Sequence, residues 1–372
     1  MLGAIIGDIV GSRWEFNPTN DYNFDLFSPK NGFTDDTICT VAVADAILHG
    51  SEDFGKYIHS WCRRYPQPMG GYGGRFAQWV KSDHPKPYGS WGNGSAMRVS
   101  PVAWAYSDRY NVLRLAELTA SCTHNHPLGI CGAQAVALAI RDCRQLHRTG
   151  ISIAADEAKR HGLQEAIRHF GRPVNLQVER VQNRFDETCE GTVPVAFWII
   201  NQSRSFEDAI RRAVSLGADA DTLGAIVGSI AETIWAIPEW MKKIALSYLP
   251  EEMREVVRAF RTYVRSLNKF AGYTTHTKSS EWMIMSDEEI EAMGNDFGVE
   301  KMSKKRNLMT VARIWHDVGW SDALTVPQEI VDPCVTCCHS GENGVCRFGY
   351  SCHKARRLTH CPTYLPEPKW LP

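Results

Sequence analysis

The stretch "GFTDDTICTVAVADAIL" at residues 32–48 joins two adjacent carboxylates, Asp35 and Asp36, to an apolar run with helical spacing. Thr34 and the two aspartates are residue types that cap helix N-termini, because their side-chain oxygens accept hydrogen bonds from the first backbone N–H groups. One such residue is enough for a cap, and two adjacent carboxylates repel each other. The stretch predicts a buried helix over 37–49 and leaves open whether its carboxylates also hold a cation.

A second helix start carries the same residue types. The stretch "SLGADADTLGAIVGSIAE" at 215–232 places Asp219, Asp221 and Thr222 before a helix of small and apolar residues. If the two starts converge, their four carboxylates need cations between them. Mg²⁺, Mn²⁺ and Ca²⁺ prefer such carboxylate and hydroxyl oxygens, whereas Zn²⁺ is disfavoured because neither stretch offers a His or Cys in ligand spacing. Two clusters of this kind suggest a site for two metal ions.

Helical periodicity dominates the first 267 residues. Apolar residues recur at helical spacing in 3–11, 37–49, 111–122, 128–147, 153–169, 193–202, 205–216, 222–236 and 251–267. Alternating patterns typical of strands are scarce. Three of these helices are rich in glycine and alanine at spacings of three and four, which lets helix axes approach closely. We therefore expect an all-α fold, a compact multi-helix domain.

Two glycine-rich loops interrupt the helical pattern, at 68–76 and 88–98. The second, "YGSWGNGSAMR", runs into the start of a helix, where free backbone N–H groups attract phosphate. A plain surface turn would have a similar composition, so the loop alone is weak evidence. His124 and His126 lie in a turn closed by Pro127. A lone histidine is more often structural, but one beside an anion-binding loop could contact a phosphate or a sugar hydroxyl.

Length and charge exclude several classes of function. The chain has 372 residues, enough for one large domain with an appendage, and a net charge of −1 that selects neither nucleic acid nor a membrane. The first eleven residues have no basic segment, and Asp8 interrupts their apolar run, so they do not resemble a signal peptide. No stretch has the 18 or so apolar residues of a membrane span. These features are typical of a soluble, cytoplasmic protein without a membrane partner.

The twelve cysteines fall into two groups. Six are scattered before residue 334, where we expect buried free thiols. The other six lie in 334–361, within a Cys-rich module at 334–372 that is too small to bury a core and therefore needs a metal or, in an exported protein, disulfides. A structural Zn²⁺ held by Cys337, Cys346, Cys352 and Cys361 is favoured, with a [4Fe–4S] cluster as the competitor. Residues 268–333 form a linker or an accessory helical segment. The basic residues of the tail could contact nucleic acid, although a solvated surface is favoured.

Five motifs, in order, resemble those of the ADP-ribosylglycohydrolase family, which includes the dinitrogenase reductase-activating glycohydrolase and other ADP-ribosyl hydrolases. They are "GDIVGSRWE" at 7–15, "TDDT" at 34–37, "GSWGNGSAMR" at 89–98, "THNHP" at 123–127 and "DADT" at 219–222. The resemblance covers about residues 1–265 and places an ADP-ribosylglycohydrolase-like domain at 1–267. It implies an all-α fold with a two-metal centre of Mg²⁺ or Mn²⁺ whose ligands are Glu15, Thr34, Asp35, Asp36, Asp219, Asp221 and Thr222.

The resemblance also implies an activity, a metal-dependent hydrolysis of the ribosyl glycosidic bond that releases ADP-ribose from an ADP-ribosylated protein or small molecule. Asp35 or Asp36 would orient or deprotonate the attacking water, and Glu15 would gate the site or act as acid–base. The diphosphate would lie on Gly89–Gly94, with His124 supporting a ribose or a phosphate. The implied substrate-binding residues are Gly89, Ser90, Trp91, Gly92, Asn93, Gly94, Ser95, Met97 and His124.

Three other hypotheses remain open: a module that binds ADP-ribose without turnover, another dinuclear-metal hydrolase acting on a nucleotide-like substrate, and a purely structural protein. The sequence does not determine the leaving group, which could be arginine, serine, nucleic acid or a small molecule. Arg75 and Trp79 are candidates to line that side of the site.

Overall fold

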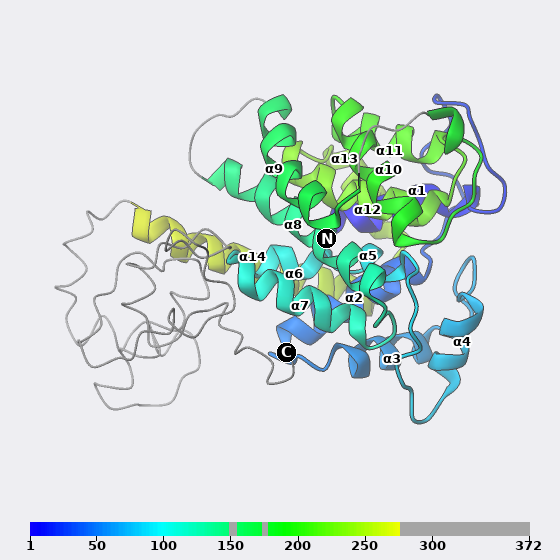
Figure 1. The fold of residues 1–372 in the computed structure, drawn as a ribbon, viewed down its shortest axis with the longest axis horizontal. Coiled ribbons are helices and arrows are strands. Elements are labelled where there is room, and N and C mark those ends of the chain that lie inside the picture. The colour runs from blue at the N-terminus through cyan, green and yellow to red at the C-terminus, as the bar shows by residue number, and fades with distance from the viewer. Residues whose placement is uncertain (149–154, 173–177, 276–372) are drawn as a thin grey trace, which may run out of the picture. The chain divides into compact units, whose positions relative to one another are not determined.

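The computed structural model describes residues 1–148, 155–172 and 178–275, and Met1–Thr274 form one compact unit. Within these ranges the predicted all-α fold is confirmed, since they hold helices and one isolated β-bridge but no strand (Figure 1). The α-helices are α1 (Leu2–Gly11), α2 (Asp35–Leu48), α3 (Phe54–Arg64), α4 (Gly74–Lys81), α5 (Gly94–Met97), α6 (Ser100–Ala105), α7 (Arg109–Ser121), α8 (Pro127–Arg148), α9 (Ala155–Phe170), α10 (Cys189–Gln202), α11 (Phe206–Ser215), α12 (Ala220–Ile234), α13 (Glu239–Ser247) and α14 (Glu251–Thr275). Two short 3₁₀ helices, Ser12–Trp14 and Val178–Arg180, lie between them.

Helices α1 and α12 run antiparallel in backbone contact. Gly3, Gly7 and Gly11 of α1 lie on Gly228, Gly224 and Ala220 of α12, and a Cβ atom at any of the three would collide with a backbone carbonyl of α12. The small-residue spacing in the sequence therefore marks the closest helix pair of the core. As a result the C-terminal end of α1, which leads to Glu15, lies beside the N-terminal end of α12, which carries Asp221 and Thr222.

Helix α2 is buried along almost its whole length, from Asp36 to Ile47. It begins at Asp35 rather than at 37, because Thr34 is the N-cap and its Oγ1 accepts a hydrogen bond from the backbone N–H of Asp36 at 3.3 Å. Asp35 and Asp36 consequently lie in the first turn, where the helix dipole favours negative charge. The N-cap is Thr34, and neither Asp35 nor Asp36 is needed for it. The capping interpretation of this stretch is therefore compatible with a cation held by the two aspartates.

Several helices were not predicted from the sequence. Helix α3 has a cap, with Asp53 Oδ1 accepting from the N–H of Lys56 at 3.1 Å, and it buries Phe54, Ile58 and Trp61 on one face. That spacing is a helical signal that could have been found. Helix α4 buries Phe76, Trp79 and Val80 at helical spacing, a signal that could also have been found, whereas the short α13 buries only Met241 and Ala245.

The remaining global predictions have clear outcomes in the described part of the chain. The six scattered cysteines are free thiols as expected, although Cys122 and Cys131 are only partly buried. None of the helices in the described ranges is long and apolar enough to cross a membrane. The predictions for 276–372, including the metal ligands Cys337, Cys346, Cys352 and Cys361, lie outside the described residues.

Candidate active site

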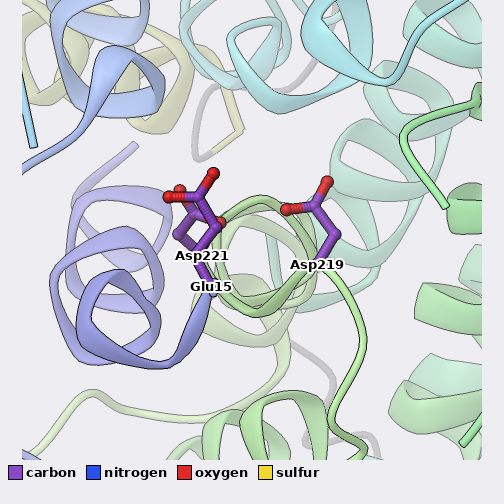
Figure 2. A group of neighbouring side chains, drawn as sticks. All are labelled: Glu15, Asp219 and Asp221. Carbon is purple, nitrogen blue, oxygen red and sulfur yellow. The ribbon is translucent and has the colours of Figure 1, made fainter. Parts of the chain in front are cut away.

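Three carboxylates from distant parts of the sequence meet where α1 ends and α12 begins. Ligand oxygens of Glu15, Asp219 and Asp221 all lie within 4.8 Å of one another (Figure 2). Asp219 is the residue before α12, Asp221 lies in its first turn, and Glu15 follows the short helix after α1. The two aspartates are buried and Glu15 is partly buried. Three carboxylate oxygens at this spacing could all contact one cation.

The start of α2 joins this cluster. The hydroxyl of Thr222 donates to Asp36 Oδ2 at 3.1 Å, so the first turns of α2 and α12 are in direct contact. Asp36 and Thr34 are buried, whereas Asp35 is partly exposed. The structure therefore brings the two aspartate-rich helix starts together, as the sequence suggested.

Asp8 is a sixth carboxylate at this place, and sequence analysis assigned it no role. It projects from α1, is fully buried, and accepts hydrogen bonds from the hydroxyl of Thr34 at 2.8 Å and from the backbone N–H of Thr37 at 3.0 Å. Its position in the "GDIVG" motif was visible in the sequence, but its partners were not. Asp8 holds the start of α2 against α1.

Several oxygens of the cluster are buried without a hydrogen-bond partner in the described structure. They are Asp36 Oδ1, Asp221 Oδ1 and Glu15 Oε2. A buried oxygen that lacks a partner costs free energy, and an ionised one costs far more. Divalent cations bound between the helix starts would give these oxygens a partner and balance their charge. The residues present therefore fit a centre for hard cations.

The pKa values of these carboxyl groups reflect the same crowding. Burial, followed by repulsion from Asp219, Asp35, Asp8 and Glu187, raises the pKa of Glu15 to about 8. Burial and the charge of Asp8 raise the pKa of Asp35 to about 7. Burial also raises the pKa values of Asp8 and Asp219 to about 6, and those of Asp36 and Asp221 well above the ordinary range. Without cations, the cluster retains protons at a pH where isolated carboxyl groups are ionised.

Glu15 is positioned by the first glycine-rich loop. Gly70 has a φ of +77°, and a Cβ atom at this position would collide with Glu15 Oε2. Tyr72 anchors the same loop, because its hydroxyl donates to the carbonyl oxygen of Tyr65 at 2.7 Å. A glycine is therefore required at residue 70 both for the backbone conformation and for the space that the Glu15 carboxylate occupies.

The second glycine-rich loop differs in detail from its predicted role. Asn93 is buried, and its Nδ2 donates to Asp219 Oδ2 at 2.7 Å, so it orients a carboxylate of the cluster. The N–H groups of Gly89, Gly92 and Asn93 already donate to Asn125 Oδ1, Ser90 Oγ and the Glu187 carbonyl. These three N–H groups of the predicted backbone cradle are therefore already hydrogen-bonded within the protein.

The other predicted substrate-binding residues divide by exposure. Ser95 and Met97 are buried in α5, and Ser95 donates to the carbonyl oxygen of Gly129 at 2.7 Å, so both pack inside the domain. Trp91 is 46% exposed and lies beside the His126 ring, with 5.6 Å between ring centroids. Trp91 is thus the member of this group with the largest free apolar surface.

His124 lies directly under the glycine-rich loop, since a Cβ atom at Gly94 would be 3.2 Å from its Nε2. Burial and then the charges of Arg98 and Arg75 hold its pKa well below the ordinary value, so the ring is neutral. Arg98 Nη2 donates to Thr123 Oγ1 at 2.7 Å, and this hydroxyl lies 2.7 Å from His124 Nδ1. Thr123 therefore links the Arg98 guanidinium to the His124 ring, whose Nε2 lies on the side of the loop.

Two exposed aromatic side chains near the cluster were missed by the sequence analysis. Phe16 directly follows Glu15 and is 71% exposed, and its ring lies 5.9 Å from that of Phe185, which is 45% exposed. They come from segments 169 positions apart (185 − 16), so no local pattern pairs them. Trp79, a sequence candidate to line the leaving-group side of the site, is buried and stacks on the ring of Phe76.

Comparison with known proteins shows similarity to one family of enzymes. A family model described as ADP-ribosylglycohydrolase matches residues 1–270. The ADP-ribosylarginine hydrolase Tri1 of Pseudomonas putida (strain GB-1) is 27% identical over 286 residues, covering 66% of this chain and 73% of that protein. The human ADP-ribosylhydrolase ARH3 is 24% identical over 318 residues, which cover 64% of this chain and 85% of that protein. A solved structure described as an ADP-ribosylglycohydrolase-related protein complex has a similar fold, with a TM-score of 0.50 at 24% identity over 71% of this chain and 97% of that one.

Proposed function

Because the chain belongs to the ADP-ribosylglycohydrolase family, we propose that it hydrolyses the ribosyl glycosidic bond of an ADP-ribosylated protein or small molecule and releases ADP-ribose. The observation that carries the proposal is the meeting of two aspartate-rich helix starts with Glu15, in a cluster whose buried oxygens lack partners. A protein that had only to fold would gain stability by replacing such carboxylates with apolar side chains.

The proposed cofactors are two Mg²⁺ or Mn²⁺ ions. Their proposed ligands are the residues that converge at the helix starts, namely Glu15, Thr34, Asp35, Asp36, Asp219, Asp221 and Thr222. When bound, such ions balance the carboxylate charge, polarise sugar hydroxyls and lower the pKa of water. The preference for Mg²⁺ or Mn²⁺ rests on the all-oxygen character of this set.

The carboxylates then divide by exposure. Asp35 is partly exposed in the first turn of α2, so it can orient an attacking water or accept its proton. Asp36 is buried and contacts Thr222, which suits a ligand better than a general base. Glu15 lies between the cluster and the loop at 68–76, a position that suits a group that gates the site or acts as acid–base.

The glycine-rich loop at 89–94 remains the proposed site for the diphosphate. His124 Nε2 lies against this loop, and in the tautomer protonated at Nε2 it would donate to a phosphate oxygen. The exposed ring of Trp91 offers a surface on which the adenine could stack. For the loop to bind phosphate through its backbone, Gly92 would exchange the hydroxyl of Ser90 for a phosphate oxygen.

The rest of the chain carries separate proposals. We propose that the catalytic domain spans 1–267, that 268–333 connects or accompanies it, and that 334–372 binds a structural Zn²⁺. The leaving group would approach beside Phe16 and Phe185, the exposed rings next to Glu15.

The test is a product assay on ADP-ribosylated arginine, serine and nucleic-acid substrates, with Mg²⁺, with Mn²⁺ and with chelator. Release of free ADP-ribose in a metal-dependent reaction is expected from at least one substrate. Asp35→Ala and Asp221→Ala should abolish release and leave the circular dichroism spectrum unchanged, because these side chains serve the cluster more than the core. Glu52→Gln, which removes an exposed carboxylate paired with Arg114, is the matched control.

Two outcomes would contradict the proposal. Tight binding of ADP-ribose with no release from any substrate would identify a binding module. Near wild-type turnover of Asp221→Ala at saturating metal would show that the two-metal assignment is wrong.

A further inference from the structure

Asp8 is fully buried in α1, and the proposed ligand set does not include it. Its carboxylate accepts hydrogen bonds from three donors at the start of α2. The Thr34 hydroxyl lies 2.8 Å from Oδ1, the Thr34 N–H lies 3.1 Å from Oδ2, and the Thr37 N–H lies 3.0 Å from Oδ2. An acidic side chain from one helix thus binds donors at the start of another.

The hydrogen bond from the Thr34 hydroxyl fixes where its proton lies. This oxygen has two acceptors within reach, Asp8 Oδ1 at 2.8 Å and Asp36 Oδ2 at 3.4 Å. The shorter contact takes the single hydroxyl proton. One lone pair of Thr34 Oγ1 accepts the N–H of Asp36 at 3.3 Å, so the other lone pair remains for another partner. A cation binds a hydroxyl only through its lone pairs, so the direction of this proton decides whether Thr34 can be a ligand.

The backbone of α1 fixes the other half of the cluster. Gly7 and Gly11, on either side of Asp8, lie against the backbone of α12 at Gly224 and Ala220, one residue before Asp221. Helix α1 therefore holds α12 by backbone contact and α2 through the side chain of Asp8. The separation between Asp36 and Asp221 is set by these two contacts together.

We propose that Asp8 is a positioning residue of the metal centre: it directs the proton of the Thr34 hydroxyl away from the cations and fixes the first turn of α2 relative to α12. The inference rests on the proposed function, since it requires that the cluster binds metal. The competing explanation is that Asp8 only caps α2 and contributes to stability. The two explanations differ in what happens to metal affinity when the fold is intact.

Asp8→Asn is the informative variant because the amide has the shape of the carboxylate, but one of the two acceptor oxygens becomes an NH₂ donor. If the amide nitrogen replaces Oδ2, it faces the N–H groups of Thr34 and Thr37, donor against donor. If it replaces Oδ1, it donates to the Thr34 hydroxyl, whose proton then turns toward the cluster. Loss of a group that orients a metal ligand costs roughly 10- to 100-fold in metal affinity, which is the expected loss for Asp8→Asn.

The experiment is a calorimetric titration of the full chain with Mn²⁺ alone, in the absence of substrate, together with thermal unfolding of each variant. Thr34→Val removes the hydroxyl and Thr34→Ser keeps it. If Asp8 acts through this hydroxyl, Thr34→Ser binds Mn²⁺ within about threefold of wild type. In the double variant Asp8→Asn/Thr34→Val the loss of affinity is then smaller than the product of the two single losses, because interacting residues are non-additive.

A separate control measures the effect of charge alone. Glu187→Gln removes an exposed carboxylate whose charge also acts on Glu15 and Asp219. It should lower Mn²⁺ affinity by much less than Asp8→Asn, because its side chain does not orient a ligand. An equal loss in the two variants would show that only the negative charge of Asp8 matters, and would overturn the inference.

The outcomes separate the two proposals. If wild type binds no Mn²⁺, the proposed function fails. If wild type binds Mn²⁺ and a folded Asp8→Asn binds it equally well, or if the losses in the double variant multiply, the inference about Asp8 fails alone. Should Asp8→Asn not fold, amide hydrogen exchange of wild type decides: saturation with Mg²⁺ should slow exchange at Thr34 and Thr37, and unchanged rates would overturn the inference.

Discussion

Removing metal from this protein should make its stability fall as the pH rises. The pKa of Asp8 is about 6 in the folded protein and near 3.8 for an ordinary aspartate. Between these values the folded state binds more protons than the unfolded state, so the free energy of unfolding decreases with increasing pH. The same sign applies to Asp35 and Glu15, whose folded pKa values are about 7 and about 8.

The magnitude follows from the size of the shift. The pKa of the fully buried Asp8 differs by about 2 units between the folded and unfolded states. At about 1.4 kcal/mol per unit, ionisation of Asp8 lowers the free energy of unfolding by about 3 kcal/mol in total. Roughly half of this decrease occurs between about pH 5 and about pH 8. The groups interact, so their effects do not add, but Asp35 and Glu15 titrate within that interval and increase the total. For a unit of this size the conversion is about 1.5 to 2 °C per kcal/mol, so the melting temperature should fall by at least about 2 to 3 °C.

The assay is thermal unfolding, followed by circular dichroism, of the chelator-treated protein between about pH 5 and about pH 8, with parallel samples that contain saturating Mg²⁺ or Mn²⁺. Groups outside the cluster titrate in the same way in both samples, so the difference in melting temperature between the two samples removes their contribution. The increase in melting temperature on adding metal should therefore grow with pH, since ionised carboxylates bind the cation. If the melting temperature in chelator stays constant or rises with pH relative to that of the metal-loaded samples, the carboxyl groups of the cluster do not have raised pKa values and the reasoning is refuted.

Gly70→Ala should lower turnover at least about tenfold, because the new Cβ displaces the Glu15 carboxylate and strains a backbone with φ of +77°; wild-type kcat would contradict the placement of Glu15. Gly7→Ala should lower the free energy of unfolding by about 1 to 3 kcal/mol, since a Cβ there collides with the backbone of α12. Gly74→Ala, whose Cβ would meet open space, is its control in the same thermal unfolding measurement. Metal analysis should find zinc bound through the segment 334–372, and a brown protein with an absorption band near about 400 nm would indicate an iron–sulfur cluster instead.

Local sequence patterns were sufficient for the helices that carry the cluster. The Thr34 cap, the aspartates that follow it and the pair Asp219 and Asp221 are all recognisable within four residues of a helix start. Helix periodicity and capping act over that range, so the pattern predicts them without knowledge of the rest of the chain. The order of the five motifs added the family, which no single motif specified.

The tertiary structure decided which of these groups meet. Asp36 contacts Thr222, 186 positions away, and Asn93 contacts Asp219, 126 positions away, a contact that no local pattern predicted. Asp8 reads in the sequence as an interruption of an apolar helix. Only the packing of α1 between α2 and α12 shows that it holds the Thr34 hydroxyl.

The physical reason for this division is range. Caps, turns and helical faces depend on neighbours within one or two turns, and the sequence by itself determined them here. The identity of the group opposite Glu15 or Asp8 depends on how closely two helices approach, which is set by the glycines at their contact and by the rest of the core. A carboxylate is an ordinary surface group until that approach buries it beside others, and its chemistry in this protein follows from the burial.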